Sequence, residues 1–273
     1  MIGAVRWAGV AIGYGGVMVG LAALATRSPD LAYSAALALP IPLLYALFRG
    51  RASPASPAPW WAGLAMWAFV VVSRAAAVAW VSAGKAPFPA GPHLAIAGIG
   101  SLFPLVALTI LLGERSGGAA FGFTGHRALR QVLLGAGLAL ALQAIMRAPM
   151  IAMGQARMGA GAFAALAQSL PTELMTIALG EESLFRGYMQ VTLQRRYPWG
   201  FATLLISALF GLWHLPAGLF APSLLTLFGV VGFPFAFGLL AGVMFRLTGS
   251  IVGLVVAHAL YNAVNAAFLV AAN

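Results

Sequence analysis

The residues best suited to chemistry in this chain are two adjacent carboxylates within a strongly apolar stretch. Glu181 and Glu182 lie inside LPTELMTIALGEESLFRGYMQVTLQRRYP, and Arg186 follows Glu182 by four positions. That spacing places Glu182 and Arg186 on one face of a helix, where they can form an ion pair. Glu181 is turned by about 100° from Glu182 and has no basic residue at this spacing. We therefore expect Arg186 to hold Glu182, and Glu181 to have no partner on its own helix.

Two histidines and an asparagine lie in the apolar segments that follow. His214 comes near the end of one segment, in ALFGLWHLP, and His258 lies inside another, in VVAHALYNAV. Asn262 follows His258 by four residues, so the two share a helix face. A lone intramembrane histidine is more often a packing residue, but polar groups in lipid must find partners, and they find them in the interior of the bundle. We expect the carboxylates, imidazoles and amide to converge from three helices.

The other charged residues of the apolar segments have structural interpretations. Glu173 lies at the start of a predicted span, a favourable position for an acid at a helix N-terminus. Asp30 and Glu114 lie at predicted span ends, where water is near. Arg74 lies inside a predicted span and either snorkels or pairs with an acid of the core.

The composition explains why the few charged residues of this chain are informative about its function. Of the 273 residues, 62% are hydrophobic and 7% are charged, whereas about 25% of a soluble domain is charged. Such a chain cannot cover a water-facing surface, so its solvent must be lipid. There are no cysteines, which excludes disulfides, thiolate metal sites and a cysteine nucleophile. The net charge of +10 is expected to set topology and to meet anionic headgroups rather than nucleic acid.

Apolar runs of the roughly 20 residues needed to cross a bilayer recur along the whole chain. They predict an all-α, polytopic transmembrane bundle of about eight or nine spanning helices. The candidate spans are 7–26, 31–48, 60–82, 94–113, 131–152, 170–196, 199–216, 224–246 and 250–271. The Gly/Ala-rich stretch 153–169 is open between a loop, an interfacial helix and an extension of a span. We divide the chain into N-terminal transmembrane helices, 1–160, and a catalytic membrane core, 161–273.

Basic residues are divided unequally between the two sides of this bundle. One side carries Arg6, Arg49, Arg51, Arg115, Arg127, Arg130, Arg195, Arg196 and Arg246, and the other carries Arg27, Lys85, Arg157 and, depending on its depth, Arg147. The positive-inside rule then predicts a cytoplasmic N-terminus and an external C-terminus. With Arg195 and Arg196 at the cytoplasmic edge, Glu181 lies about 21 Å along its helix, in the outer half of the bilayer.

Three motifs of the chain resemble those of one family. GEESLFRG (180–187) resembles the EExxxR motif of the CAAX prenyl endopeptidase and bacteriocin-processing (CPBP) intramembrane proteases. FGLWH (210–214) resembles its FxxxH motif, and HALYN (258–262) its HxxxN motif. The motifs occur in the family's order, each on a hydrophobic segment, and the resemblance covers about 165–271. It implies an endopeptidase that hydrolyses peptide bonds within or near the membrane.

The resemblance also implies a division of labour among these residues. Glu181 would activate a water with help from His214, since a carboxylate desolvated among apolar helices becomes a stronger base. His258 and Asn262 would stabilise the tetrahedral oxyanion. The ion pair next to Glu181 would orient the site.

Metal dependence stays open at this point. The family is often labelled metalloprotease, and Glu181, His214 and His258 form a plausible zinc set. The helix-borne HExxH pattern is absent, however, and Asn262 is a poor zinc ligand. We therefore favour a glutamate mechanism that requires no cofactor.

Two other functions fit the same residues. A proton-coupled transporter also uses intramembrane Glu, Arg and His, although these residues here all lie in the C-terminal part of the chain. A CPBP-like scaffold or immunity protein would keep the fold without cutting. The expected partners are the lipid bilayer and a membrane protein or peptide substrate. The Ala/Gly/Arg-rich composition indicates a bacterial cell membrane, where leader removal or trimming of a sorting tail is expected rather than cleavage of a prenylated tail.

Overall fold

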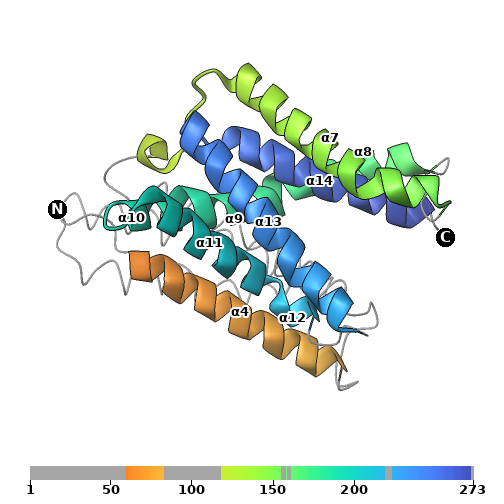
Figure 1. Ribbon diagram of the computed structural model, residues 1–273, viewed down its shortest axis with the longest axis horizontal. Helices are drawn as coiled ribbons and strands as arrows, with labels where there is room; N and C mark the ends of the chain where they lie inside the picture. Colours follow the sequence, from red (N-terminus) through yellow and green to blue (C-terminus); the bar gives the residue numbers. More distant parts are fainter. Residues whose placement is uncertain (1–59, 83–117, 155–157, 159–160, 219–222, 272–273) are drawn as a thin grey trace, which may run out of the picture.

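The computed structural model describes residues 60–82, 118–154, 158, 161–218 and 223–271, and all regular structure in these ranges is helical (Figure 1). The elements are α4 (Trp60–Ser82), the 3-10 turn η1 (Gly118–Phe121), α7 (Ala128–Ala152), α8 (Ala162–Thr172), the π-helix η2 (Glu173–Ala178), α9 (Leu179–Glu182), the π-helix η3 (Ser183–Gln190), α10 (Val191–Gln194), α11 (Trp199–Trp213), α12 (Leu215–Gly218), α13 (Leu224–Thr248) and α14 (Val252–Ala271). The predicted all-α class is therefore confirmed for the described residues.

Several predicted spans coincide with observed helices. The helix α4 covers the predicted range 60–82, and α7, α13 and α14 begin and end within a few residues of the ranges predicted for them. Within the described residues, α7 and α13 are long and apolar enough to cross a membrane. The predicted spans 7–26, 31–48 and 94–113 lie outside the described residues, as does the side chain of Arg74, so the number of spans stays a prediction.

The helix that carries the paired carboxylates begins earlier than predicted. It runs without interruption from α8 through η2, α9 and η3 into α10, so part of the ambiguous stretch 153–169 extends the span. Two segments of this helix are π-helical, with the short α9 between them. A π-turn accommodates an extra residue, and π-bulges are frequent at functional sites.

Close helix crossings depend on glycine. A Cβ added to Gly135 of α7 would collide with the carbonyl oxygen of Gly253 of α14. A Cβ added to Gly242 of α13 would lie 2.5 Å from the side chain of Thr203 in α11. Small residues of this kind let helix backbones approach closely, and polar groups on neighbouring helices then come within hydrogen-bond reach.

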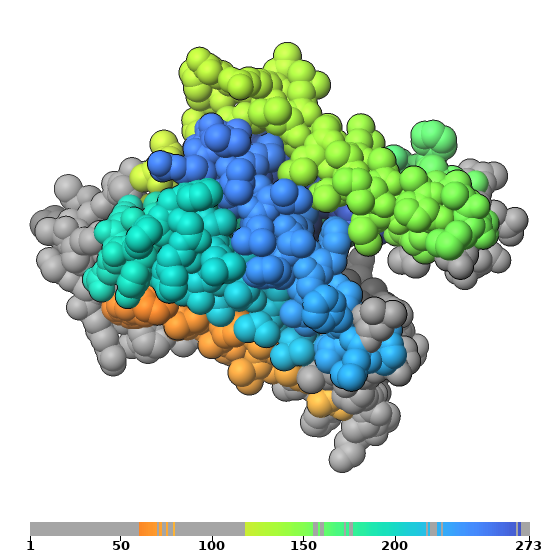
Figure 2. All heavy atoms as spheres, in the orientation of Figure 1, coloured from red at the N-terminus to blue at the C-terminus, as the bar shows by residue number. Residues whose placement is uncertain are grey.

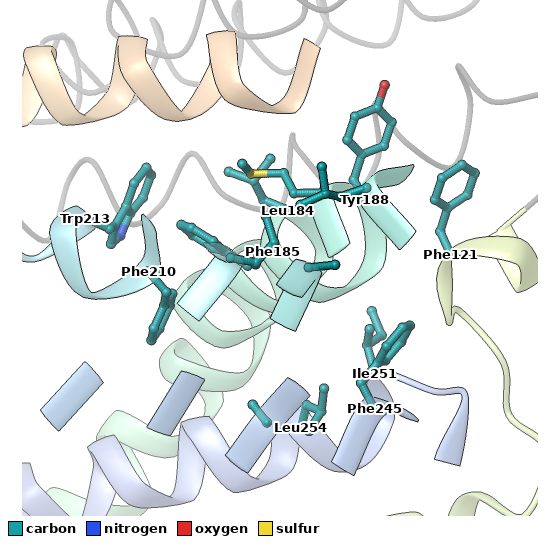
Figure 3. Packing of buried hydrophobic residues seen from close by; sticks show 14 of the residues in the cluster. Phe121, Leu184, Phe185, Tyr188, Phe210, Trp213, Phe245, Ile251 and Leu254 are labelled. Atoms are coloured by element: carbon teal, nitrogen blue, oxygen red, sulfur yellow. The ribbon is translucent and has the colours of Figure 1, made fainter. Parts of the chain in front are cut away.

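An aromatic core holds η3 in place (Figure 3). The Phe185 ring packs edge-on against Phe210 and Trp213 of α11, with ring centroids 4.9 and 5.5 Å apart. At the other end of η3, the Tyr188 ring stacks on Phe121 with centroids 5.7 Å apart. Edge-to-face and offset-stacked pairs of this kind add to the stabilisation from burial. The core therefore fixes the position of the helix that carries the charges.

Three connections of the chain meet at one end of the bundle. The backbone N–H of Ile251 donates to the carbonyl oxygen of Gly122 at 3.0 Å, and the Ser250 hydroxyl donates to the carbonyl oxygen of Thr124 at 3.1 Å. The Arg195 guanidinium lies 5.7 Å from the centre of the Phe121 ring. We call this the basic end, because exposed arginines gather there: Arg127, Arg130, Arg195, Arg196 and Arg246. All five were predicted to share one side of the membrane, and the assignment of that side to the cytoplasm stays a prediction.

Candidate active site

The adjacent carboxylates lie on α9, between the two π-helices, and both are buried in the protein interior. Glu181 is 3% exposed, and Glu182 is not exposed at all. Arg186 lies on η3 and is also completely buried. Burying a charge is costly unless it is paired and hydrogen-bonded, so the partners of these groups decide what the site can do.

Glu182 is held from two sides. Arg186 Nη1 lies 3.2 Å from Oε1 and 3.1 Å from Oε2, which is the ion pair that the sequence spacing predicts. His258 Nδ1, from α14, lies 2.8 Å from Oε1. A carboxylate paired with a guanidinium only accepts hydrogen bonds, so the Nδ1–H of His258 is the donor. This contact between two of the predicted motifs is one that the sequence did not reveal.

Glu181 lies against both α11 and α14. Trp213 Nε1 donates to Oε1 at 3.0 Å, and His258 Nε2 lies 3.8 Å from Oε2. The partners of Glu181 therefore come from other helices, which spacing along a single helix could not predict. His258 lies between the two carboxylates, with Nδ1 on Glu182 and Nε2 facing Glu181.

His214 lies directly after α11 and is oriented by its own backbone. Its Nδ1 is 2.9 Å from the carbonyl oxygen of Phe210, and a carbonyl can only accept, so Nε2 is the acceptor nitrogen of the neutral ring. The Phe210 ring lies edge-on to the rings of both histidines, with centroids 5.1 Å from His214 and 5.9 Å from His258. The Arg186 guanidinium lies 4.3 Å from the centre of that ring. Phe210 therefore positions the cation and both imidazoles.

A cavity of about 290 Å³ opens beside these groups. Its polar wall includes His214, His258 and Asn262, and much of the rest is apolar and aromatic. The other lining residues are Phe210, Gly229, Val230, Phe233, Pro234, Phe237, Tyr261 and Asn265. An apolar cleft with a few convergent polar groups is the usual form of a substrate site. Glu181 is almost fully buried, next to the His258 side chain that forms part of the wall.

A second polar cluster follows the site along α14. Asn262 Nδ2 donates to Glu173 Oε2 at 2.9 Å. Gln143 Nε2 donates to Asn265 Oδ1 at 3.0 Å, and Arg147 Nη2 donates to the same oxygen at 2.6 Å. We call these five residues the outer network, and they connect α14 to α7 and to η2.

Glu173 was interpreted as an acid at a helix start, and that interpretation was wrong. The helix begins at Ala162 of α8 and continues through Glu173, so no N-terminal N–H groups are exposed there to stabilise the acid. Its structural partner is instead the amide of Asn262. The sequence contained one signal for the contact between Glu173 and Asn262. Glu173 is an acid in an apolar run, and it lies at a distance from any predicted base.

The predicted metal set does not form one ligand sphere. In the ranges that the structure describes, no group of three or more His, Cys, Asp and Glu side chains could hold a metal ion. The Nδ1 of His258 is occupied by Glu182, and the Nδ1 of His214 by the carbonyl oxygen of Phe210. Glu181, His214 and His258 thus do not fit a zinc site in this arrangement.

The candidate site thus combines buried carboxylates, one of them paired with Arg186, two imidazoles and an apolar cleft, and α13, which lines this cleft, is long and apolar enough to span a bilayer. Residues 162–264 match the family described as type II CAAX prenyl endopeptidase, Rce1-like. The match covers less than half of the chain, and it confirms the predicted resemblance of this segment to the CPBP proteases, which are peptide hydrolases. No curated protein and no solved structure matches the chain.

The family match contains all of the predicted site residues, and the structure brings them into one region. They are Glu181, Glu182, Arg186, His214, His258 and Asn262. Sequence reasoning missed Trp213, Phe210 and Glu173, although the first two lie within the FGLWH segment itself. The catalytic roles of these residues, and the division of the chain at residue 160, stay predictions.

Proposed function

We propose that the protein is an intramembrane endopeptidase that hydrolyses a peptide bond, in or near the membrane, of a processed or exported protein or peptide. The observation that carries this proposal is the position of His258, which contacts both carboxylates and forms the wall of a cleft with His214 and Asn262. A base, a proton partner and a hydrogen-bond donor beside an apolar cleft are the groups that acyl hydrolysis requires.

In the proposed mechanism, Glu181 is the base. It accepts a proton from the attacking water, whose oxygen forms a bond to the carbonyl carbon while the C=O π electrons move to the carbonyl oxygen. The nitrogen of the scissile bond then takes up this proton, and the C–N bond breaks to give an acid and an amine. Trp213 holds one oxygen of the Glu181 carboxylate, and His258 Nε2 lies beside the other, so the base is oriented before the substrate arrives.

The geometry favours a different role for His258 from the one implied by the resemblance. Its Nδ1–H is donated to Glu182, and its Nε2 faces Glu181. We propose that the His258 ring shares the proton that Glu181 accepts, and that Glu182 and Arg186 hold the ring in place. Asn262 donates one of its two amide hydrogens to Glu173, and the second can donate to the oxyanion. The acceptor Nε2 of His214 is suited to position the water.

The decisive test compares Glu181→Gln with wild type in proteoliposomes. Two probes are used: a fluorogenic farnesylated peptide ending in a CAAX-type sequence, and a membrane-anchored leader peptide. We expect Glu181→Gln to lower cleavage by about 10²–10⁴-fold, because the amide cannot accept the proton. Gln168→Ala, on the exposed face of α8, is the matched control. Retention of a tenth of wild-type activity by Glu181→Gln would contradict the proposed base.

The two probes also separate the substrate classes. We propose that the leader peptide is cut and the farnesylated peptide is not, since the predicted topology places Glu181 in the outer half of a bacterial cell membrane. An externally accessible tag after Asn273 is expected from the same topology. A cytoplasmic tag, or a preference for the farnesylated peptide, would reverse this assignment.

We also propose that catalysis requires no metal. The nitrogens of His258 lie against two carboxylates, and Nδ1 of His214 is bonded to the backbone, so coordination would require the rings to leave these partners. Cleavage is expected to continue after treatment with EDTA and 1,10-phenanthroline. Loss of activity on chelation, with recovery on addition of Zn²⁺, would show a metal enzyme instead.

A further inference from the structure

A second cavity lies outside the active site, between the first turns of α7 and the last turns of α13. It has a volume of about 540 Å³. The two helices lie against each other in Figure 2, where α7 is yellow-green and the end of α13 is blue. None of its described lining residues also lines the active-site cavity. The two cavities are therefore distinct sites.

The two ends of this cavity differ in chemistry. At one end it is lined by Arg127, Arg130 and the polar Gln131. Along the remainder it is lined mainly by aliphatic side chains: Leu134, Leu138, Leu240, Val243 and Leu247. Among the described lining residues none is acidic. A ligand that matches this surface has an anionic head and an apolar tail.

The polar end of the cavity contains a buried side-chain oxygen that lacks a hydrogen-bond donor among the described residues. Gln131 is 5% exposed, and its Nε2 donates to the carbonyl oxygen of His126 at 2.7 Å. Its Oε1 is buried and has no hydrogen-bond partner among the described residues. Leaving a buried acceptor unsatisfied is costly. A hydroxyl on the head of the ligand would supply the hydrogen bond.

Backbone geometry also indicates that the side chain of Arg127 matters at this position. Arg127 is the one non-glycine residue with positive φ in the described ranges, with φ 53°, and it is the N-cap of α7 without a side-chain capping bond. Glycine or asparagine adopts this conformation at lower cost. Strained residues of this kind cluster at ligand sites.

Since α7 and α13 are long and apolar enough to cross a bilayer, the arginine end of the cavity is expected near the headgroups. Arg127 and Arg130 belong to the basic end, where Arg246 of α13 is also exposed. The aliphatic wall then extends along both helices away from this end, and Leu247 is 80% exposed. A basic pocket between membrane helices near the interface is a recognised form of anionic lipid site.

From these observations we infer that the cavity between α7 and α13 binds one anionic glycerophospholipid with a hydroxyl-bearing headgroup. Arg127 and Arg130 bind the phosphodiester, Gln131 accepts a hydrogen bond from the headgroup hydroxyl, and one acyl chain lies along the leucines of the two helices. This inference does not depend on the proposed catalytic mechanism, because binding is measured without turnover.

The test measures retention of three lipids by the purified full-length protein, using native mass spectrometry. Phosphatidylglycerol has both the charge and the hydroxyls, phosphatidylmethanol has the charge alone, and phosphatidylcholine has neither net charge nor hydroxyl. We expect phosphatidylglycerol to be retained about fivefold better than phosphatidylmethanol, as one hydrogen bond would give. Equal retention of phosphatidylglycerol and phosphatidylcholine would overturn the inference.

Matched variants locate the site. Arg127→Gln with Arg130→Gln is expected to lower phosphatidylglycerol retention about tenfold or more. Arg195→Gln with Arg196→Gln removes the same charge from the same end without touching the cavity, and it should change retention less than twofold. Equal losses in the two double variants would show general attraction to a basic surface and overturn the site.

Two further variants separate a lipid from other occupants. Gln131→Met should abolish the preference for phosphatidylglycerol over phosphatidylmethanol. Val243→Trp fills the aliphatic part and should lower retention of both lipids, with unchanged thermal unfolding as the check on folding. If Val243→Trp folds and retains lipid normally, another segment or a substrate chain occupies the cavity, and the inference is wrong.

Discussion

Two polar regions lie next to each other on α14 and are built on different principles. The inner cluster consists of Glu181, Glu182, Arg186, Trp213 and His258. It is ionic and nearly closed to solvent, with exposed fractions of 6% or less among its charged groups and His258. The outer network of Gln143, Arg147, Glu173, Asn262 and Asn265 is joined largely through amide groups. Arg147, Glu173 and both asparagines there are partly exposed.

The difference indicates what each region is for. Burying charges inside a helix bundle costs free energy. Replacing them with hydrophobic residues of similar volume would often leave the protein at least as stable. The cost of keeping two carboxylates at such a place favours the catalytic role that we propose for them. Amide hydrogen bonds between α14, α7 and η2 cost less to bury and fix the helix that carries His258. An arginine-to-methionine substitution should therefore lower the unfolding free energy more in the inner cluster than in the outer network.

The largest effect on folding is expected from Arg186→Met. It leaves Glu182 fully buried without its guanidinium, and breaking a buried pair in this way costs about 3–5 kcal/mol of unfolding free energy. Thermal unfolding in detergent micelles, followed by circular dichroism, measures the loss.

A double variant distinguishes charge from packing. In Glu182→Leu with Arg186→Met, both charges are removed, so most of the lost stability should return. Activity should stay low, because His258 no longer has the acceptor that orients its ring. If the double variant is as unstable as Arg186→Met, the loss comes from the packing of Arg186 on Phe210 rather than from the uncompensated carboxylate.

A smaller effect is expected from Trp213→Phe, and it should appear in catalysis. The substitution removes the N–H that donates to Glu181 and keeps an aromatic ring against Phe185. We expect kcat to fall about tenfold, the effect of roughly one lost hydrogen bond, with KM nearly unchanged. A purely structural role would instead lower the thermal stability and leave kcat per folded molecule unchanged.

Much of the helical fold could be predicted because it depends on local pattern. The apolar run of α4 and the turn between α13 and α14, where Gly249 has φ 65°, are visible as sequence signals. The π-helices η2 and η3 could not be predicted, since apolar periodicity does not distinguish an extra residue in a turn. The start of α8 stayed open, because the Gly/Ala-rich composition of 153–169 does not distinguish a loop or an interfacial helix from an extension of the span.

The residues that the structure brings together could be named from the sequence, but most of the contacts between them could not. The pairing of Glu182 with Arg186 follows from spacing along one helix, and the structure contains it. The contacts of His258 with both carboxylates, and of Trp213 with Glu181, join helices far apart in sequence. Such contacts depend on how the helices cross, which spacing within one helix does not specify.

The smallest effect is expected from Arg147→Met, which repeats the arginine-to-methionine change in the outer network. Arg147 Nη2 donates to Asn265 Oδ1, but Gln143 donates to the same oxygen, so the acceptor stays satisfied in the variant. The guanidinium is also partly exposed and stacks on Phe268, a contact that methionine partly replaces. We expect a loss of about 1 kcal/mol in unfolding free energy and cleavage within twofold of wild type. A loss as large as that of Arg186→Met would mean that the two regions form one electrostatic unit, and the contrast between them would no longer hold.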